Sequence, residues 1–399
     1  MKTGWETGAL ASISEVFTDG NWIESKDQAT DGIRLVQTGN VGEGVFKERR
    51  DKARWIDEDT FARLNCFEVL PGDCLISRLP DPVGRACLIP DTGDKMITAV
   101  DCSIVRPDET KIDPRLLVYF TQSRVYLRDV DERCSGTTRR RISRENLGKV
   151  PIPLPPLEEQ QRIVGVLDEA FEGLARARAH AEANLQNVRE LFESIKANAL
   201  AYKGPDREEV ILSEVSDITS GLVDPRENDY ADMLHLGAGN MITGTDELVD
   251  VKTAREEKLK SGKYLFDETT ILYSKIRPYL RKAARPDFQG LCSADVYPLT
   301  PKPDRLDKDF LFHLLLGHDF TEYAISGSDR AGMPKVNRNH MFAYRFELPP
   351  IEAQRRIATA IDEAHISCSA LVELANKKLQ DLDDLRQSLL QKAFAGELT

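Results

Sequence analysis

The feature that most constrains this chain is a stretch of seventeen residues that occurs twice. Residues 154–170 read LPPLEEQQRIVGVLDEA and residues 348–364 read LPPIEAQRRIATAIDEA, and ten of the seventeen positions are identical at an offset of 194. Weaker identities continue in the same register, for example at Leu185 and Leu379. A period this long is too large for a solenoid, so the chain contains a duplicated module.

Each copy predicts a long helix that begins at a pair of prolines. The second proline fits the first helical turn, and the glutamate after it suits the positive end of the helix dipole. Apolar residues then recur every three or four positions without a proline, which is typical of a coiled-coil seam. In the second copy this seam includes Ile357, Ile361, Ala364, Cys368, Leu371 and Leu385. At ~1.5 Å per residue each helix would be roughly 65 Å long, so we expect these helices to be spacers.

The composition of the 399 residues is that of a globular protein of two or three domains. No apolar run reaches membrane-spanning length and the polar first residues do not resemble a signal peptide, so we expect a cytoplasmic protein without a membrane partner. The seven cysteines include no C-x-x-C pair, which argues against zinc and against a disulfide framework. The net charge of −12 opposes binding to a polyanion, but the basic side chains are clustered, and partners are expected to supply part of any phosphate contact.

The two non-helical segments, residues 1–150 and 205–345, also resemble each other. Gly39-Asn40 follows a β-prone run in the first, and Gly239-Asn240 follows the corresponding run in the second. In both, short β-prone runs separated by turn signals lead to a short helix with an acidic cap. The predicted strands are 74–77, 85–89, 96–100, 270–274 and 294–299, and the predicted short helices are 115–123 and 308–317.

These patterns predict an α+β fold in which two mixed α/β domains are separated by two long antiparallel coiled-coil helices with pseudo-two-fold symmetry. Two like modules in one chain tend to dock about a two-fold axis, as a homodimer does, which would place the domains at opposite ends. Such a body suits a duplex that is read as two half-sites. The predicted boundaries are 1–152 and 204–347 for the domains, and 153–203 and 348–399 for the helices.

The strongest basic cluster is a Gly- and Thr-rich loop, SGTTRRRISR, just before the first long helix. Its counterpart before the second helix reads SGSDRAGMPKVNR. Arginine forks and small hydroxyls on a loop suit DNA phosphates and guanine edges, and a solvated basic loop is the alternative. The DNA-binding candidates in these loops are Thr137, Thr138, Arg139, Arg140, Arg141, Arg144, Arg330, Lys335 and Arg338.

A second basic segment, SKIRPYLRKAARP at residues 274–286, contains no acidic residue. It fits a strand and turn that track the phosphate backbone, and it would equally suit a protein partner. Lys275, Arg277 and Arg281 are the DNA-binding candidates here, and Arg78 is a weaker one in the aligned segment of the first half.

Two polar residues after the first predicted strand are further candidates for base reading. Gln37 and Asn40 carry amides, which can bond an adenine edge bidentately. In the alternative interpretation, Asn40 is a turn residue in the left-handed conformation after Gly39.

Catalytic and metal-binding patterns are missing from the sequence. There is no G-x-x-x-x-G-K-S/T loop, no Asn/Asp-Pro-Pro-aromatic motif and no Gly-rich cofactor loop after a strand. The six histidines are scattered without metal-ligand spacing. We therefore expect no catalytic or metal-binding residues, and a chain that is not an enzyme by itself.

The assembled pattern resembles the specificity subunit of type I restriction–modification systems, over the whole chain. The segments that carry the resemblance are PIPLPPLEEQQRIVGVLDE (151–169), FELPPIEAQRRIATAIDE (346–363), SGTTRRRI (135–142) and SLLQKAFAGELT (388–399). The resemblance implies a non-catalytic subunit with two target-recognition domains, each reading one half of a bipartite DNA sequence. The antiparallel helices would then set the spacing. The second pre-helix loop departs from the first because it lacks the Thr-Thr pair.

The same resemblance implies partners. Two modification subunits would dock on the helices and bring S-adenosylmethionine for adenine methylation, and restriction subunits would add ATP-driven translocation and cleavage. S-adenosylmethionine, ATP and Mg²⁺ would therefore be bound by partners, and we expect no cofactor in this chain. The residues assigned to partner binding are Leu157, Gln160, Arg162, Ile351, Gln354 and Arg356.

Two other interpretations remain open on the sequence. The chain could be the specificity chain of another defence methylation system. It could also belong to a different class, as a self-contained DNA methyltransferase or a coiled-coil scaffold. An enzyme would need a cofactor loop, which is missing from the sequence, and a scaffold would not need two arginine-rich loops.

Overall fold

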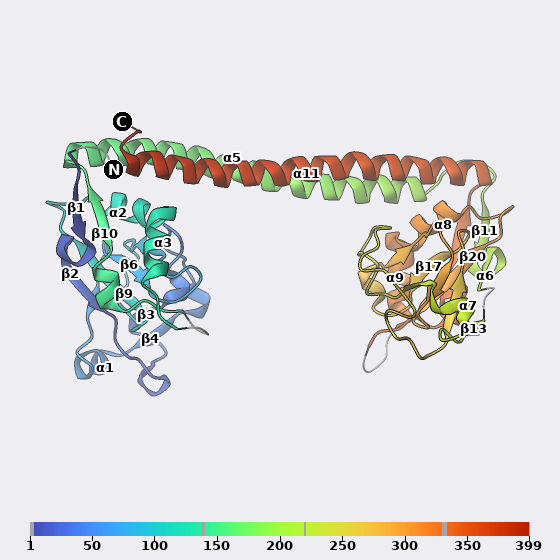
Figure 1. The fold of residues 1–399 in the computed structure, drawn as a ribbon, viewed down its shortest axis with the longest axis horizontal. Helices are drawn as coiled ribbons and strands as arrows, with labels where there is room; N and C mark the ends of the chain where they lie inside the picture. The colour runs from blue at the N-terminus through green and yellow to red at the C-terminus, as the bar shows by residue number, and fades with distance from the viewer. Residues whose placement is uncertain (1–3, 137–139, 219–220, 329–332, 399) are drawn as a thin grey trace. The chain divides into compact units, whose positions relative to one another are not determined.

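The computed structural model describes residues 4–136, 140–218, 221–328 and 333–398. The chain forms two compact units, which are drawn with their secondary structure in Figure 1. Unit 1 comprises Met1–Glu182 and Lys377–Thr399, and unit 2 comprises Ala183–Asn376. Each unit therefore contains one α+β globule together with one end of each long helix.

In its described part, unit 1 has two four-stranded sheets and a two-stranded one. The first sheet is antiparallel, in the order β2 (Ser14–Asp19), β9 (Cys102–Pro107), β6 (Cys74–Ser77) and β7 (Ala86–Leu88). The second has the order β4 (Arg54–Ile56), β3 (Ile33–Val36), β8 (Met96–Thr98) and β5 (Glu68–Val69), with β3 and β8 parallel. Strand β1 (Glu6–Ala9) pairs with β10 (Pro151–Leu154), just before the first long helix.

Strand β6 connects the layers of unit 1. Leu75 belongs to a core that it shares with Val36 and Met96 of the second sheet, whereas Cys74 and Ile76 belong to the core beneath the helices. Successive side chains of a strand point to opposite faces, so a strand that is covered on both sides reads as a continuous apolar run. The helices of this unit are α1 (Glu58–Arg63), α2 (Pro114–Thr121), α3 (Arg124–Glu132) and α4 (Arg144–Gly148).

Unit 2 repeats this architecture. Its first sheet has the order β12 (Ser216–Asp217), β20 (Val296–Pro301), β17 (Ile271–Ser274) and β18 (Ala283–Ala284). Its second has the order β13 (Leu222–Val223), β16 (Lys263–Phe266), β19 (Gly290–Cys292), β14 (Leu234–Leu236) and β15 (Lys252–Thr253), and β14 and β19 are parallel like β3 and β8. Strand β11 (Glu208–Ile211) pairs with β21 (Arg345–Leu348).

The described part of unit 2 has five short helices, of which the last three occur in the same order as α2, α3 and α4 of unit 1. They are α6 (Leu212–Val215), α7 (Asn228–Ala231), α8 (Lys308–Leu315), α9 (His318–Ser326) and α10 (Arg338–Phe342). The expected α+β class and the internal likeness of the two halves are thus confirmed. The five predicted strands and two predicted short helices are present, with bounds that differ by a few residues.

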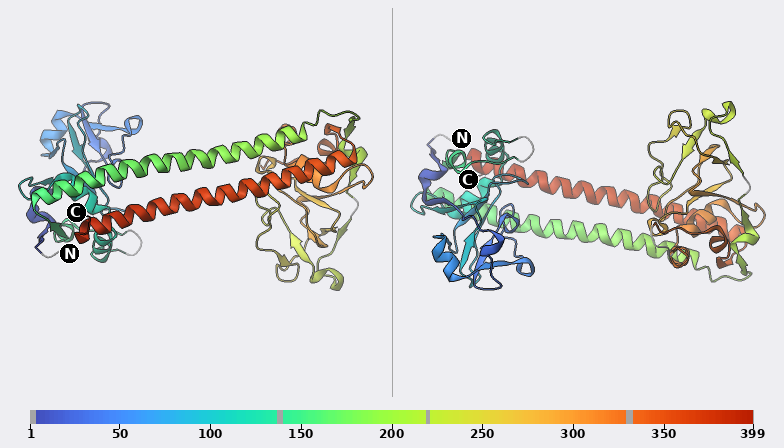
Figure 2. Two further views of the ribbon diagram at one scale, coloured as in Figure 1. Left: turned by 90° about the horizontal axis from the view of Figure 1, so that it is seen from above. Right: turned by 90° about the horizontal axis from the view of Figure 1, so that it is seen from below.

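The two long helices are α5 (Leu157–Leu200) and α11 (Ile351–Ala395). Both are present as predicted, but each begins directly after the proline pair, whereas the second proline was expected in the first helical turn. In unit 1 they run antiparallel: Leu390 and Phe394 of α11 share a core with Ile163 of α5, and Arg178 further along α5 pairs with Asp383 at 2.6 Å. In unit 2, the rings of Phe192 and His365 contact each other in a tilted arrangement, with centroids 5.4 Å apart. Figure 2 gives two more views of the pair. Within the described residues, no helix has the length and apolarity needed to cross a membrane.

A buried glutamine fastens each globule to its long helix. The Gln160 Oε1 accepts the backbone N–H of Asp113 at 2.8 Å, and its Nε2 donates to the carbonyl oxygens of Lys111 and Pro155. Gln354 does the same with Asp307, Arg305 and Pro349, at positions 194 residues later. Both amides are fully buried, and each satisfies backbone groups at the cap of a short helix that would otherwise be unpaired.

This geometry corrects the assignment of Gln160 and Gln354 to partner binding. Neither side chain is accessible to another protein, because each is 0 % exposed and all its amide hydrogens and oxygens face the globule. The other four assigned residues retain surface: Leu157, Arg162 and Arg356 are exposed, and Ile351 is half-buried. The glutamine of the repeated motif is therefore a structural clamp.

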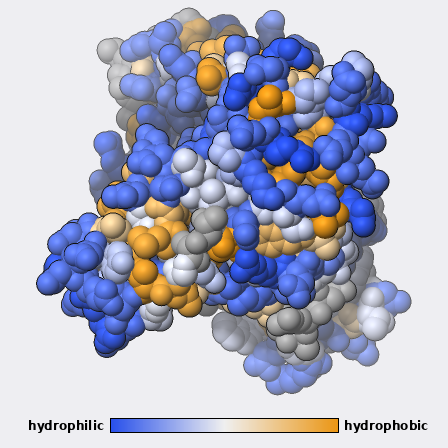
Figure 3. Space-filling view, turned by 90° about the vertical axis from the view of Figure 1, so that its right-hand side faces the viewer, coloured by the Kyte–Doolittle hydropathy of each residue, from blue (hydrophilic) through white to orange (hydrophobic). Residues whose placement is uncertain are grey.

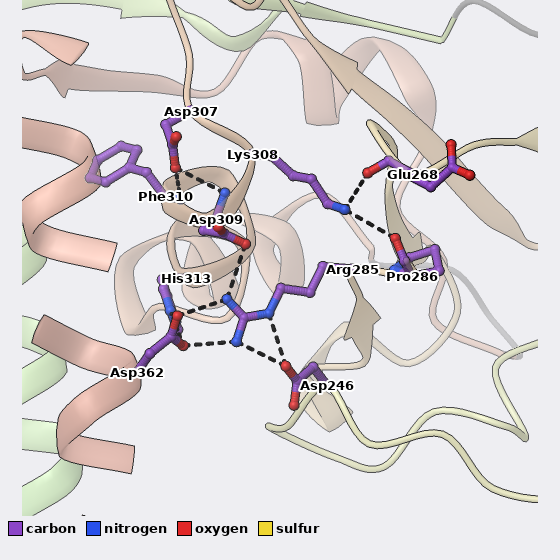
Figure 4. A network of polar contacts seen from close by, with 10 residues as sticks. All are labelled: Asp246, Glu268, Arg285, Pro286, Asp307, Lys308, Asp309, Phe310, His313 and Asp362. Atoms are coloured by element: carbon purple, nitrogen blue, oxygen red, sulfur yellow. Dashed lines mark hydrogen bonds and ion pairs between the residues drawn. The ribbon is translucent and has the colours of Figure 1, made fainter. Parts of the chain in front are cut away.

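A second polar contact joins each globule to its helix, with different partners in the two units. In unit 1 the Asp168 carboxylate of α5 accepts from Arg115 at 3.0 Å and from the Tyr119 hydroxyl. In unit 2 the corresponding residue is Asp362 of α11, which accepts from both outer nitrogens of Arg285 and contacts His313 at 3.0 Å. Figure 4 shows this unit 2 network.

Arg285 is the centre of the unit 2 network. Besides Asp362, its guanidinium contacts Asp246 at 2.9 Å and Asp309 at 3.1 Å. Burial alone would raise the pKa of the Asp362 carboxyl, but the hydrogen bonds from His313 and Arg285 outweigh it and hold that pKa well below its usual range. Arg285 is therefore committed to the attachment of the globule.

We expect Gln354→Leu to lower the free energy of unfolding by about 3 kcal/mol, because it leaves one backbone N–H and two carbonyl groups buried without partners. Urea denaturation followed by circular dichroism measures this loss. Gln161→Leu is the matched control, since Gln161 is an exposed glutamine in the first turns of α5. Equal stability of Gln354→Leu and the wild-type protein would contradict the clamp.

We expect Asp362→Asn to destabilise the chain by about 2 kcal/mol at neutral pH, because it removes one partner of a half-buried charge network. A carboxyl with a lowered pKa stabilises the fold above its unfolded pKa, and this stabilisation is lost as the pH falls through the folded pKa. The difference from the wild-type protein should therefore shrink in strong acid. Asp383→Asn, in an exposed pair, should change stability by less than about 1 kcal/mol.

Candidate nucleic-acid interface

Three loops meet in unit 1 and carry all of its DNA-binding candidates. They are residues 37–41 after β3, residues 78–85 between β6 and β7, and the described part of residues 134–144 before and at the start of α4. We call these three loops the unit 1 loop cluster. The first and third loops lie more than ninety residues apart in the sequence, so only the fold brings them together.

Hydrogen bonds fix these loops to one another. The buried Arg85 donates from Nε to the carbonyl oxygen of Val41 at 2.8 Å and from Nη2 to that of Thr38 at 3.0 Å, which joins the first two loops. The third loop is joined through its backbone, since the Ile142 N–H donates to the carbonyl oxygen of Arg78 at 3.4 Å. Arg85 thus positions the loops and is not available to DNA.

Unit 2 has a corresponding unit 2 loop cluster. It consists of residues 237–241, residues 275–282 and the described part of residues 327–338. Lys282 takes the place of Arg85 and donates from Nζ to the carbonyl oxygen of Ala238 at 2.7 Å. The Val336 N–H donates to the carbonyl oxygen of Lys275 at 2.9 Å, as Ile142 does 194 positions earlier. The duplication has therefore preserved how the loops are tied.

Asn40 is a structural residue, which corrects its assignment to base reading. Its Oδ1 accepts the Gln37 N–H and its Nδ2 donates to the carbonyl oxygen of Lys47, both at 3.0 Å. Asn240 makes the same bonds to Gly237 and to a later carbonyl. Asn40 ends a 3-10 turn and does not have a positive φ, so the alternative left-handed conformation is also wrong. Gln37 is half-buried and remains a base-reading prediction.

Arg78 is also wrongly predicted to contact DNA. Its side chain is buried, and its guanidinium donates to the carbonyl oxygen of Val100 and lies 3.3 Å from Asp19. Burial lowers the pKa of this arginine, which the Asp19 carboxylate partly offsets. Arg78 supports the loop cluster from inside.

The exposed arginines of the third loop fit a phosphate contact better. Arg140 pairs with Asp131 at 2.9 Å and Arg141 with Asp101 at 3.1 Å, and all four side chains keep substantial exposure. Exposed pairs of this kind contribute little to stability, so a phosphate can replace the carboxylate at small cost. Arg144 is exposed at the first residue of α4. Three candidates of this loop, Thr137, Thr138 and Arg139, lie outside the described residues.

In unit 2 most of the predicted cations are engaged with acidic residues. Asp295 lies between Lys275, at 3.5 Å, and Lys335, at 2.9 Å. The other two pairs are Arg281 with Glu193 of α5 at 3.0 Å and Arg338 with Asp217 at 3.1 Å. Arg281 is thus bound to the long helix, whereas Lys335 and Arg338 keep exposed surface. Arg330 lies outside the described residues.

Arg277 differs from these residues. It is exposed, and within the described residues its side chain has no hydrogen bond or ion pair. Arg277 was predicted from the sequence, whereas its neighbour Tyr279, which is 52 % exposed, was missed. The loop-fixing role of Arg85 and Lys282, which lie in the two basic segments, was missed as well. The signal for Tyr279 was present, because it is the aromatic residue of the acid-free run at 274–286.

The chemistry available at both clusters is recognition through cations, amides and backbone groups. In the part of the chain that is described, no three acidic, histidine or cysteine side chains come together as a metal site. Burial raises the pKa of Cys87 to about 12 and that of Cys102 to about 11, so these thiols are poor nucleophiles at neutral pH.

Comparison with known proteins places this geometry in a family. The family model for the type I restriction modification DNA specificity domain matches residues 2–180 and 206–381. The EcoDI specificity subunit of a type I restriction enzyme from Escherichia coli is 34% identical over 47% of this chain, a match that covers 41% of that subunit. The StySPI specificity subunit from Salmonella potsdam is 24% identical over 75% of this chain and 68% of the relative.

Solved structures share the fold over the full chain. A chain from a study of complex assembly and conformational transition in the type I R-M system aligns with a TM-score of 0.80 and 18% identity, over 100% of this chain and 99% of that one. The HsdS subunit from Thermoanaerobacter tengcongensis aligns with a TM-score of 0.60 and 17% identity, over 100% and 98%. Because the family model matches two consecutive segments that together cover most of the chain, this chain belongs to the type I restriction modification DNA specificity family.

Proposed function

We propose that this chain is the DNA-reading subunit of a type I restriction–modification complex, and that each unit reads one half of a bipartite double-stranded target. The observation that carries this proposal is the duplicated loop cluster, in which the same ties present exposed cations twice in one chain. Reading a duplex at two separated half-sites requires two such surfaces. The chain itself contributes recognition, and catalysis resides in its partners.

Electrostatics support a partner-dependent contact with DNA. The exposed arginines of the loop clusters suit phosphates, but the whole chain carries a net charge of −12. Long-range attraction to the duplex is therefore weak for this chain alone. We expect the modification subunits to supply much of the phosphate contact, together with S-adenosylmethionine, and restriction subunits to bring ATP and Mg²⁺.

The long helices present apolar side chains that suit these partners. Ile366 is 69 % exposed and Leu374 63 % exposed, and Leu371 and Leu385, which the sequence placed in the seam, are also exposed. Two helices alone cover only a narrow stripe of each other, so outward-facing leucines of this kind are typical of a surface that a partner helix covers. Each unit would dock one modification subunit.

Grooves beside the long helices add to this docking surface. In unit 1 a groove of about 940 Å³ lies between α3 and the end of α11, lined by Phe120, Val125 and Phe394 among others. In unit 2 a groove of about 600 Å³ occupies the corresponding place, with Leu314 and Leu200 at positions equivalent to Phe120 and Phe394. Figure 3 shows hydrophobic residues in patches between hydrophilic ones on one face of the molecule.

The primary test is adenine-methylation mapping across the genome of a host that expresses this chain with its modification subunit. We expect a motif of two specified parts separated by an unspecified spacer. Exchanging residues 1–152 for the corresponding domain of a relative should alter one part and leave the other unchanged. A continuous motif, or methylation that persists without this chain, would overturn the proposal.

The spacing role of the helices has its own test. Deleting residues 178–184 together with 372–378 removes one heptad from each helix near their point of pairing, which shortens the pair by ~10 Å. That length corresponds to about three base pairs and roughly 100° of rotation about the duplex. We expect a shorter spacer in the methylated motif, or loss of methylation. An active deletion variant with an unchanged spacer would contradict a ruler function.

A further inference from the structure

The turn between β17 and β18 in unit 2 presents an aromatic side chain on a strained and rigid backbone. Residues Pro278–Leu280 form a short 3-10 turn, η5, flanked by Arg277 with φ +49° and Arg281 with φ +45°. A left-handed conformation is unfavourable for residues with a side chain, so two of them around one turn persist only where surrounding contacts impose them. Such strain tends to occur at functional sites.

Contacts on three sides impose this conformation. The Arg277 N–H donates to the carbonyl oxygen of Pro334 at 2.8 Å, and the Gly244 N–H donates to that of Arg281 at 2.9 Å. The Arg281 guanidinium is held by Glu193 of α5, and Pro278 is buried. The turn is therefore fixed by the third loop, by the segment after the first loop and by the long helix.

Two side chains that project from this fixed turn, those of Arg277 and Tyr279, have no polar partner among the described residues. Tyr279 is 52 % exposed, and within the described residues its hydroxyl makes no hydrogen bond. The neighbouring Arg277 is the exposed cation of the unit 2 loop cluster that no described carboxylate engages. A rigid ring loses little conformational freedom on binding, and its face can stack on a base, while a free guanidinium suits phosphate or a base edge.

The corresponding turn of unit 1 is different. Residues 78–85 read RLPDPVGR and contain no aromatic residue, and Val83 packs against the core of the unit. The ties between the loops are shared by the two units, but the exposed Arg-Pro-Tyr tip occurs in unit 2 alone. A feature confined to one unit can affect only the half-site that this unit reads.

We propose that Arg277 and Tyr279 form the DNA-reading tip of unit 2, in which Tyr279 stacks on a base or base step and Arg277 contacts the phosphate or base edge beside it. This inference rests on the proposed function, in which unit 2 reads one half of the target. Arg281 is then a positioning residue, because its contact with Glu193 fixes the tip without leaving its charge free for DNA. Tyr279 thereby determines specificity in one half-site.

A DNA partner fits the tip better than a protein partner. The tip lies among the loops that carry the exposed Lys335 and Arg338, and its own segment contains no acidic residue from 274 to 286. The apolar side chains suited to partner helices, such as Ile366 and Leu374, lie on α11 instead. The cationic surroundings of Tyr279 favour a polyanion.

The test uses the complex of the full chain with its modification subunit, and the duplex defined by methylation mapping with the wild-type chain. We expect Tyr279→Ala to weaken binding of that duplex by about 5- to 150-fold, the range for loss of one base-stacking contact, and to relax the methylated motif in one half only. Tyr279→Phe should retain both binding and motif, because the ring is kept. Arg277→Ala should weaken binding and flatten its dependence on salt.

Two control variants make the outcome specific. Arg305→Ala removes an exposed arginine of unit 2 beside the Gln354 clamp and should leave the motif unchanged. Trp22→Ala removes an exposed aromatic residue of unit 1 and should leave the half-site of unit 2 unchanged. Since Tyr279 is exposed, the melting temperature of Tyr279→Ala should match that of the wild-type protein.

Tyr279→Ala with wild-type affinity and an unchanged motif would overturn the proposed tip while leaving the two-unit function intact. Weaker binding of the modification subunit, with an unchanged motif in the remaining methylation, would also overturn it, since Tyr279 would then contact a protein. Failure of the proposed function itself looks different, because the wild-type complex would then methylate no bipartite motif.

Discussion

The buried glutamine at the start of each long helix is the contact on which the other features depend. Gln160 and Gln354 each form hydrogen bonds with the backbone at the cap of a short helix and with the backbone of the proline pair. The first turn of the long helix and the globule therefore form one body. A buried carbonyl group left without a hydrogen bond costs more free energy than a surface ion pair contributes. Movements that break these hydrogen bonds are therefore unfavourable, which makes this junction rigid. The loops of each globule therefore keep a fixed position relative to the start of the long helix that follows it.

Beyond that junction, the two units make equivalent contacts between globule and helix with different side chains. Asp168 and Asp362 occupy equivalent positions, but the first binds Arg115 and Tyr119 and the second binds Arg285 and His313. The same holds for the loop clusters, where Arg85 and Lys282 reach the equivalent carbonyl groups. The backbone frame is therefore repeated more faithfully than the side chains that support it.

Sequence reasoning succeeded where local chemistry decides the structure. Helices α5 and α11 are specified by local features: a pair of prolines, apolar residues at every third or fourth position, and an internal repeat. None of these depends on the rest of the chain. It failed where burial decides. Asn40 and Arg78 have the side chains of base readers, and only the packing of residues distant in sequence places their polar atoms inside. Gln160 was misassigned for the same reason, and Tyr279 was missed because the acid-free run at 274–286 was assessed for its cations alone.

A rigid frame with variable loops separates two demands on the protein. The glutamine junctions tie each globule to its long helix through buried backbone groups, so substitutions there are costly. The loops are tied through backbone groups, as with Ile142 and Val336, and through the side chains of Arg85 and Lys282. These ties do not depend on which other side chain projects outward. Residues at the tips can therefore change while the ties that hold the loops stay the same. The contrast between RLPDPVGR and the Arg277–Tyr279 turn is one such change, made on the same supporting frame.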